Sequence, residues 1–232
     1  MEYLPNGITL EIPEGAFPLS TDSMALAHFA KLGKNACVLD LASGCGTLGL
    51  LLCARDPGCM VRGVELDPDA HHAALRNIAR NGLSNRLESI CADAGQVPVI
   101  FAPGSFSVCI SNPPYFSGGP AAKTVATARR EDTLSLDALM KSAAWALKFG
   151  GDFFLVHRPE RLAQIIALGA QNGLEAKRLR LMRHRQGDAI SLILLQLRKG
   201  AKPGLTIEEE SLYHRDGSPT QYYREIYHTE EA

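Results

Sequence analysis

One short segment places hydrogen-bond acceptors beside aromatic rings: Asn112-Pro113-Pro114-Tyr115-Phe116. The prolines fix the backbone and lack N–H donors, so the Asn112 amide oxygen and the Pro113 carbonyl remain as acceptors. Two such acceptors can hold both hydrogens of a planar NH₂ group and leave its lone pair directed at an electrophilic methyl group. Tyr115 or Phe116 would stack on a flat substrate, which is worth about 1–3 kcal/mol per base. The segment predicts N-methylation of a planar amine; the structural alternative is a rigid turn after a strand.

A glycine-rich loop precedes this segment in the chain. Gly44, Gly46 and Gly49 have the spacing G-x-G-x-x-G, and Glu65 ends the next predicted strand about 20 residues on. Glycines at a helix N-terminus let backbone N–H groups approach a ligand closely. The spacing is formally that of a dinucleotide site, so NAD is one candidate ligand. A turn that only packs a helix against a strand is the structural alternative.

Three acidic residues end three successive predicted strands: Asp40, Glu65 and Asp93. Asp40 lies at the mouth of the glycine loop, where it would repel a diphosphate and attract an ammonium group. Glu65 would accept hydrogen bonds from two ribose hydroxyls, and Asp93 one from an adenine amino group. S-adenosylmethionine carries all of these groups, so the acids favour it over NAD. Asp67 and Asp69 are expected to cap a helix instead.

Strands and helices alternate along the chain. The N-terminal part predicts a strand or hairpin arm at 7–12 and a helix at 24–30. Strands are expected at 37–42, 61–66, 87–93, 106–112 and 152–157, and helices at 47–55, 68–81, 134–149 and 159–172. The last two strands, 175–183 and 190–199, lack room for a crossover helix and must form an antiparallel hairpin. The pattern predicts a Rossmann-like α/β fold whose sheet is mostly parallel and seven-stranded, with helices on both faces.

Length and composition fit a globular protein with one main domain. The chain has 232 residues and a net charge of −1, with 46% hydrophobic and 21% charged residues. Its longest apolar stretches are far shorter than the ~20 residues of a membrane-spanning helix, and its N-terminus lacks a secretory signal. We expect an N-terminal extension at 1–34, a methyltransferase domain at 35–202, and an acidic, tyrosine-rich tail at 203–232 that packs on or trails from it.

The cysteine pattern predicts free thiols and a cytoplasmic location. No two cysteines form a C-x-x-C pair and most lie in apolar runs, so they are expected to be reduced. The histidines also lack metal-binding spacing, so no metal is expected. The six cysteines are at positions 37, 45, 53, 59, 91 and 109.

Positive charge is concentrated in one part of the chain. Residues 129–202 sum to +7, against −3 for 1–128 and −5 for 203–232. A basic surface of this size predicts contact with nucleic acid, whereas a solvated face or a charged edge strand is the structural alternative. The irregular segment 116–133 is expected to be a lid ordered by substrate. The side chains expected to bind RNA are Phe116, Lys123, Arg129, Arg130, Arg183 and Arg185. The basic residues at 198–202 are expected to extend this surface.

Eight segments carry a family resemblance that runs from about residue 7 into the tail: 20–30, 38–46, 63–67, 77–83, 111–116, 128–131, 157–162 and 198–204. Together they resemble the class I S-adenosylmethionine-dependent methyltransferases of the Asn-Pro-Pro-Tyr type. More narrowly, they resemble the bacterial tRNA(Val) adenine-N6-methyltransferases. The resemblance implies the class I methyltransferase fold and methylation of the exocyclic N6 of an adenine in tRNA, in the anticodon loop of tRNA(Val).

The resemblance also implies roles for individual residues. The expected catalytic residues are Asn112, Pro113, Pro114 and Tyr115. Those expected to bind S-adenosylmethionine are Asp40, Ala42, Gly44, Gly46, Glu65, Leu66, Asp93, Ala94 and Asn112. Two positions depart from the family pattern: Ala42 stands where a first glycine is usual, and Arg130 replaces an expected histidine.

Three other functions fit parts of this sequence. An Asn-Pro-Pro-Tyr segment serves any planar NH₂ group, so a protein glutamine amide or a guanine amino group of rRNA is an alternative substrate. A non-catalytic RNA-binding module that retains a cofactor pocket is a second alternative, and an NAD-dependent oxidoreductase a third. The sequence gives no prediction of the oligomeric state.

Overall fold

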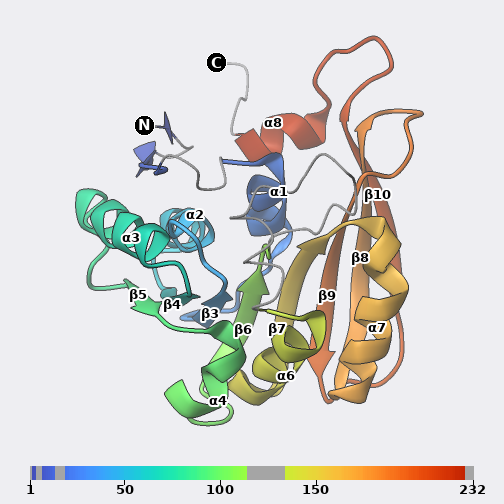
Figure 1. Ribbon diagram of the computed structural model, residues 1–232. Helices are drawn as coiled ribbons and strands as arrows, with labels where there is room; N and C mark the ends of the chain where they lie inside the picture. Colours follow the sequence, from blue (N-terminus) through green and yellow to red (C-terminus); the bar gives the residue numbers. More distant parts are fainter. Residues whose placement is uncertain (1, 4–6, 14–18, 114–133, 228–232) are drawn as a thin grey trace, which may run out of the picture.

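An eight-stranded sheet forms the centre of the protein in a computed structural model, which describes residues 2–3, 7–13, 19–113 and 134–227. Its strands are β3 (Cys37–Leu41), β4 (Met60–Glu65), β5 (Leu87–Cys91), β6 (Phe106–Ser111), β7 (Leu147–His157), β8 (Leu174–Arg185), β9 (Leu192–Lys199) and β10 (Thr206–Tyr213). They lie in the order β10-β8-β9-β7-β6-β3-β4-β5 (Figure 1). β9 runs antiparallel to β7 and β8, whereas the other neighbours are parallel. The predicted Rossmann-like fold with its antiparallel hairpin is confirmed, with one strand more than expected.

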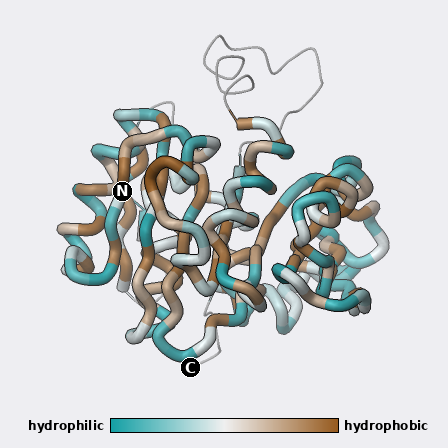
Figure 2. The backbone as a smooth tube through the Cα atoms, turned by 90° about the horizontal axis from the view of Figure 1, so that it is seen from below, coloured by the Kyte–Doolittle hydropathy of each residue, from teal (hydrophilic) through white to brown (hydrophobic). Residues whose placement is uncertain are grey.

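Helices cover both faces of this sheet. α1 (Thr21–Phe29), α2 (Thr47–Arg55), α3 (Pro68–Arg80) and α8 (Gln221–Tyr227) pack on one core, and α4 (Val97–Ile100), α6 (Leu136–Ala146) and α7 (Leu162–Gln171) on the other. Short 3₁₀ helices, η2 (Ala94–Gln96) and η3 (Pro159–Arg161), precede α4 and α7. Alternate residues of a strand serve the two cores: Val108 and Ile110 of β6 pack in one, and Cys109 in the other. Figure 2 shows the hydropathy of each residue along the backbone. No helix in the described ranges is long and apolar enough to cross a membrane.

The start of β7 differs from the prediction. The sequence predicts a helix that continues to residue 149 and stops at the following glycines, but β7 already begins at Leu147, which pairs with Phe106. The strand register shifts after this pair. Gly150 has φ 77°, and a Cβ on Gly151 would lie only 2.9 Å from the Ser107 carbonyl oxygen. The two glycines therefore serve a bulge inside a strand rather than a helix end.

The acidic C-terminal segment belongs to the fold. At the N-terminal end, by contrast, the chain forms a separate short antiparallel pair, β1 (Glu2–Tyr3) with β2 (Thr9–Leu10). The C-terminal segment instead extends the main sheet. β10 adds a parallel edge strand beside β8, and α8 contacts both α1 and β10. The Glu208 carboxylate lies 2.6 Å from Arg180 Nη2 and 3.4 Å from Arg178 Nε. Opposite charges on neighbouring strands favour their pairing, so these contacts help to hold the eighth strand beside β8.

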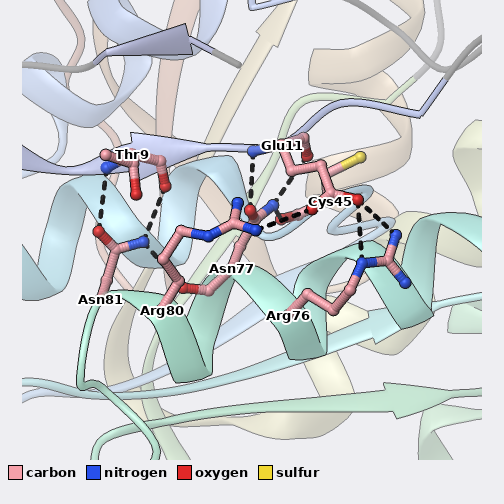
Figure 3. Close-up of polar contacts among 7 residues, drawn as sticks. All are labelled: Thr9, Glu11, Cys45, Arg76, Asn77, Arg80 and Asn81. Carbon is pink, nitrogen blue, oxygen red and sulfur yellow. Dashed lines mark hydrogen bonds and ion pairs between the residues drawn. The ribbon is translucent and has the colours of Figure 1, made fainter.

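Side chains of α3 hold the N-terminal segment in place (Figure 3). Asn81 accepts a hydrogen bond from the Thr9 N–H at 3.0 Å and donates one to the Thr9 carbonyl at 2.8 Å. Asn77 accepts from the Glu11 N–H at 2.7 Å and donates to the Glu11 carbonyl at 2.9 Å. The Asn77 Nδ2 also donates to the Cys45 carbonyl at 3.1 Å. Asn77 therefore connects the N-terminal segment to the glycine loop.

Replacing Asn77 with alanine is expected to lower the free energy of unfolding by about 2–4 kcal/mol. The side chain is fully buried, and its removal leaves backbone groups at Glu11 and Cys45 without partners. Urea denaturation measures this loss. The matched control is Glu11→Gln, which weakens surface ion pairs with Arg76 and Arg80 and should cost under about 1 kcal/mol. Equal losses in both variants would contradict this role of Asn77.

Candidate active site

The carboxyl ends of four parallel strands bring predicted site residues to one edge of the sheet. Asp40 lies near the end of β3, Glu65 ends β4, Asp93 follows β5 and Asn112 follows β6. β3 lies between β4 and β6, and β5 lies on the far side of β4. Ligands of such sheets bind outside the carboxyl ends of the strands, so this edge is the candidate site.

Glu65 organises the glycine loop. Its Oε2 accepts a hydrogen bond from the Gly44 N–H at 2.8 Å, and its Oε1 accepts one from the Asp67 N–H at 2.8 Å. Gly44 and Gly46 have φ of 56° and 84°, and Gly46 is the N-cap of α2. A Cβ on Gly44 would meet no atom within 4 Å, so the space beside the loop is open. Each Glu65 oxygen keeps a second lone pair that can accept a ribose hydroxyl.

Asp40 is a buried acid at the base of this loop. Its side chain is 1% exposed, and Oδ1 has no hydrogen-bond partner among the described residues. Burial raises the pKa of Asp40 well above its usual range, repulsion from the Glu65 carboxylate raises it further, and the Gly49 N–H opposes both. A buried acceptor without a donor costs about 1–3 kcal/mol. A cationic donor on a ligand would satisfy Oδ1 and favour the carboxylate form.

Asn112 is held by a side chain of α1. Its Nδ2 donates a hydrogen bond to Ser23 Oγ at 2.9 Å, and Ser23 is buried. Ser111 Oγ donates to the Leu41 carbonyl at 2.7 Å, which joins the end of β6 to the end of β3. The Ser23 contact fixes the orientation of the Asn112 amide, with Oδ1 as its acceptor side.

Asp93 combines a local cap with remaining acceptor capacity. Its Oδ1 accepts a hydrogen bond from the Gly95 N–H at 2.7 Å, at the start of η2. The carboxylate keeps further lone pairs for an amino group. Ala94 is buried in the core, so only its backbone can contact a ligand, whereas Leu66 is 44% exposed. No cluster of three metal-ligating side chains occurs within the described ranges.

Comparison with known proteins identifies the family. Residues 20–169 match the family described as the methyltransferase small domain. The chain belongs to this family. A relative from Photobacterium profundum is 30% identical over 86% of this chain and 85% of its own length. One from Tolumonas auensis is 33% identical over 84% and 81%. Both are named tRNA1(Val) (adenine(37)-N6)-methyltransferase, so the resemblance found in the sequence is confirmed.

Solved structures agree on the fold of this methyltransferase. A predicted O-methyltransferase from Agrobacterium tumefaciens has a TM-score of 0.76 and 22% identity, and covers 90% of this chain and 96% of its own. Geranyl diphosphate methyltransferase in complex with SAM has a TM-score of 0.57 and 14% identity, over 77% and 84%. Membership of this family supports methyl transfer. It argues against the NAD-dependent oxidoreductase that the glycine spacing left open.

Ala42 has an unusual backbone conformation in this methyltransferase. Its φ is 58°, in the left-handed region that favours glycine, where an L-residue costs about 1–2 kcal/mol. Ala42 therefore keeps the backbone conformation of the usual first glycine under strain, and the turn is not rearranged.

Ala42→Gly is expected to raise the free energy of unfolding by up to about 1 kcal/mol, because relief of strain exceeds the added entropy of the unfolded chain. Thermal denaturation tests this, with Ala42→Val as the control that should lower the melting temperature. A glycine variant less stable than the natural chain would show that φ 58° costs nothing here.

Two groups of basic residues, Arg183 with Arg185 and the stretch 198–202, lie at opposite ends of the strands. This corrects the expectation of one continuous basic surface. Arg183 and Arg185 lie at the carboxyl end of β8, near the candidate site. Arg198 pairs with Asp152 of β7 and lies opposite Glu175 near the start of β8, so the stretch 198–202 lies at the amino ends of the parallel strands. Arg183 also pairs with Glu209 at 3.2 Å, and only Arg185 remains exposed. The exposed positive charge at this end of the hairpin is therefore smaller than the sequence predicts.

Several predicted site residues fall outside the described residues. They include the second half of the Asn-Pro-Pro-Tyr segment and the whole expected lid: Pro114, Tyr115, Phe116, Lys123, Arg129 and Arg130. Of the predicted catalytic residues, Asn112 and Pro113 are described, and Pro113 is buried.

Sequence reasoning missed Ser23, the residue that orients Asn112. Ser23 lies in the segment 20–30, which carried the family resemblance but received no role. Its position in the first turn of a mostly apolar helix is the available signal, because a small polar residue that is buried there needs a partner. Nothing in the sequence identifies that partner as Asn112, 89 positions later.

Proposed function

We propose that this methyltransferase transfers a methyl group from S-adenosylmethionine to the exocyclic N6 of an adenine in tRNA, the adenine at position 37 of tRNA(Val). The observation that carries the proposal is the Asn112 amide, which Ser23 orients at the same edge of the sheet as Asp40 and Glu65. Relatives that align over most of this chain carry that activity in their names.

The residues at the sheet edge fit the cofactor. Glu65 would hold the two ribose hydroxyls, Asp93 the adenine amino group, and Asp40 the ammonium group of the methionine part. The open space at Gly44 and the unsatisfied Oδ1 of Asp40 both support this fit. S-adenosylmethionine supplies an electrophilic methyl group carried on sulfur.

The contribution of the chain to the reaction is positioning. Asn112 Oδ1 and the Pro113 carbonyl would accept the two N–H groups of the target amine, so that its lone pair points out of the ring plane. The attacking nitrogen needs no general base, because its extra proton can leave to water after the methyl group has been transferred. The Ser23 hydroxyl keeps the Asn112 amide from rotating, which would replace the acceptor with a donor.

The proposal includes a tRNA partner and a cytoplasmic location. All six cysteines are free thiols, and four of them are buried. Free thiols are typical of a reducing compartment, in which tRNA is modified.

The test uses the purified protein, labelled S-adenosylmethionine and tRNA(Val) transcripts. We expect the label in N6-methyladenosine after digestion to nucleosides, and none from a transcript with guanine at position 37. Total RNA and total protein are incubated in parallel. Label on guanine or on protein glutamine would contradict the proposed substrate and support the alternatives that share the planar NH₂ group.

A further inference from the structure

Four aromatic side chains form a continuous row, which we call the aromatic row: His184, Tyr213, Tyr223 and Tyr227. Ring centroids lie 5.0 Å apart for His184 and Tyr213, 5.2 Å for Tyr213 and Tyr223, and 4.6 Å for Tyr223 and Tyr227. The row crosses from β8 and β10 to α8, so three separate segments contribute to it. These tyrosines have no part in the site described above.

The aromatic row leads toward the candidate active site. At one end, the hydroxyl of Tyr227 lies 2.7 Å from Thr21 Oγ1, at the start of α1. The same helical turn carries Ser23, which holds the Asn112 amide. At the other end lies His184, near the end of β8. Because β8 runs in the same direction as β7 and β6, its carboxyl end lies at the same edge of the sheet as that of β6.

Exposed positive charge flanks the outer end of the row. Arg185 and Arg215 are exposed, and neither has an ion-pair partner within the described ranges. Asp188 and Asp216, the carboxylates of the two adjoining turns, accept hydrogen bonds from the Arg185 N–H and from Ser218. The arginines earlier in β8 instead form ion pairs with two acids of β10.

Packing of α8 accounts for only part of the row. Tyr222 and Ile226 anchor this helix, since they are 4% and 2% exposed in the core. Tyr213, Tyr223 and Tyr227 pack against the same core but keep part of their surface in solvent. A helix already held by two buried side chains leaves these partly exposed rings available for contact with a ligand.

We propose that the aromatic row is the surface on which nucleotides adjacent to the target base stack, as part of a single-stranded RNA loop. This inference rests on the proposed function, because it assigns to the same site the way it holds its RNA. Aromatic rings with neighbouring cations suit unpaired nucleotides, since rings stack on bases of any sequence and arginines contact phosphates. The inner end of the row contacts α1 two positions from Ser23, so a loop on the row would lie at the same end of the sheet as Asn112.

The first test measures binding of the anticodon stem-loop of tRNA(Val) by full-length variants. Tyr213→Leu and Tyr223→Leu remove a ring but keep apolar volume, and each is expected to raise the Kd roughly 5- to 100-fold. Tyr213→Phe and Tyr223→Phe keep the ring and should stay within about threefold of the natural protein. The matched control is Phe149→Leu, which removes an 81% exposed ring near the amino end of β7, at the opposite edge.

The second measurement uses the natural protein, so it does not depend on how the variants fold. A stem-loop with 5-iodouridine beside the target adenine is irradiated, and cross-linked peptides are mapped by mass spectrometry. We expect cross-links to the four residues of the aromatic row. If the leucine variants bind as tightly as the natural chain, or cross-links lie only elsewhere, the aromatic row is not the RNA surface. Methylation of tRNA by the natural protein in that same preparation would leave the proposed function intact, and its absence would overturn both.

Discussion

Asn112→Ala is expected to lower the rate of methyl transfer by on the order of 10²–10³-fold, the loss typical of removing one positioned hydrogen-bonding group from an active site. The variant loses an acceptor for the target amine, whereas Asp40, Glu65 and Asp93 remain in place. Affinity for S-adenosylmethionine should therefore change by no more than a few-fold. The amide also sits at the end of a buried strand, so the substitution leaves the sheet pairing of β6 unaltered.

Single-turnover rates at saturating tRNA measure the chemical step, and calorimetry measures cofactor binding. Ser23→Ala is the informative companion, because Ser23 is a positioning residue that acts through the amide. We expect it to reduce the rate less than Asn112→Ala does, and Ser23→Thr to restore part of the loss. A double variant no slower than Asn112→Ala alone would show that the two residues act as one unit. Full turnover by Asn112→Ala would refute the acceptor mechanism.

Local spacing made the candidate site predictable. The positions of Asp40, Glu65, Asp93 and Asn112 follow from strand ends, and strand ends follow from short apolar runs bounded by glycine, proline and acids. The parallel connection rule then places those ends at one edge of the sheet. No contact between distant residues had to be known for this step.

Features that depend on distant partners were not predictable in this way. Glu208 looks like part of a solvated acidic tail until Arg178 and Arg180 of β8 are found beside it. Gly150-Gly151 signals a helix end as readily as a bulge, and the choice depends on pairing with β6. Asn77 fits an ordinary helix position, yet its contacts reach back 66 residues to Glu11. Each case needs the sheet order before its local signal can be interpreted.

Asp40→Asn is expected to weaken S-adenosylmethionine binding about 10- to 100-fold and at the same time to stabilise the ligand-free protein at neutral pH by roughly 1–3 kcal/mol. The two effects have one cause. Oδ1 is buried without a donor, so the carboxylate form is costly until a cationic group binds beside it. The natural residue thus lowers the stability of the free protein in favour of the complex.

The pH dependence separates this cause from simple loss of a contact. Because the folded-state pKa of Asp40 is raised, the folded protein holds its proton at pH values where the unfolded chain, with a pKa near 4, has lost it. The stability of the natural protein should therefore fall as pH rises from about 4 toward the folded-state pKa, and Asp40→Asn should lack that part of the decline.

Cofactor binding should release a proton from the natural protein below the folded-state pKa of Asp40, since a cation beside the group lowers its pKa. Calorimetry in buffers with different ionisation enthalpies counts that proton, and Asp40→Asn should not release it. The matched control is Asp69→Asn, an exposed acid in the first turn of α3, which should bind cofactor and release protons as the natural chain does. Proton release that persists in Asp40→Asn would place the titrating group elsewhere, with Glu65 as the next acid to replace.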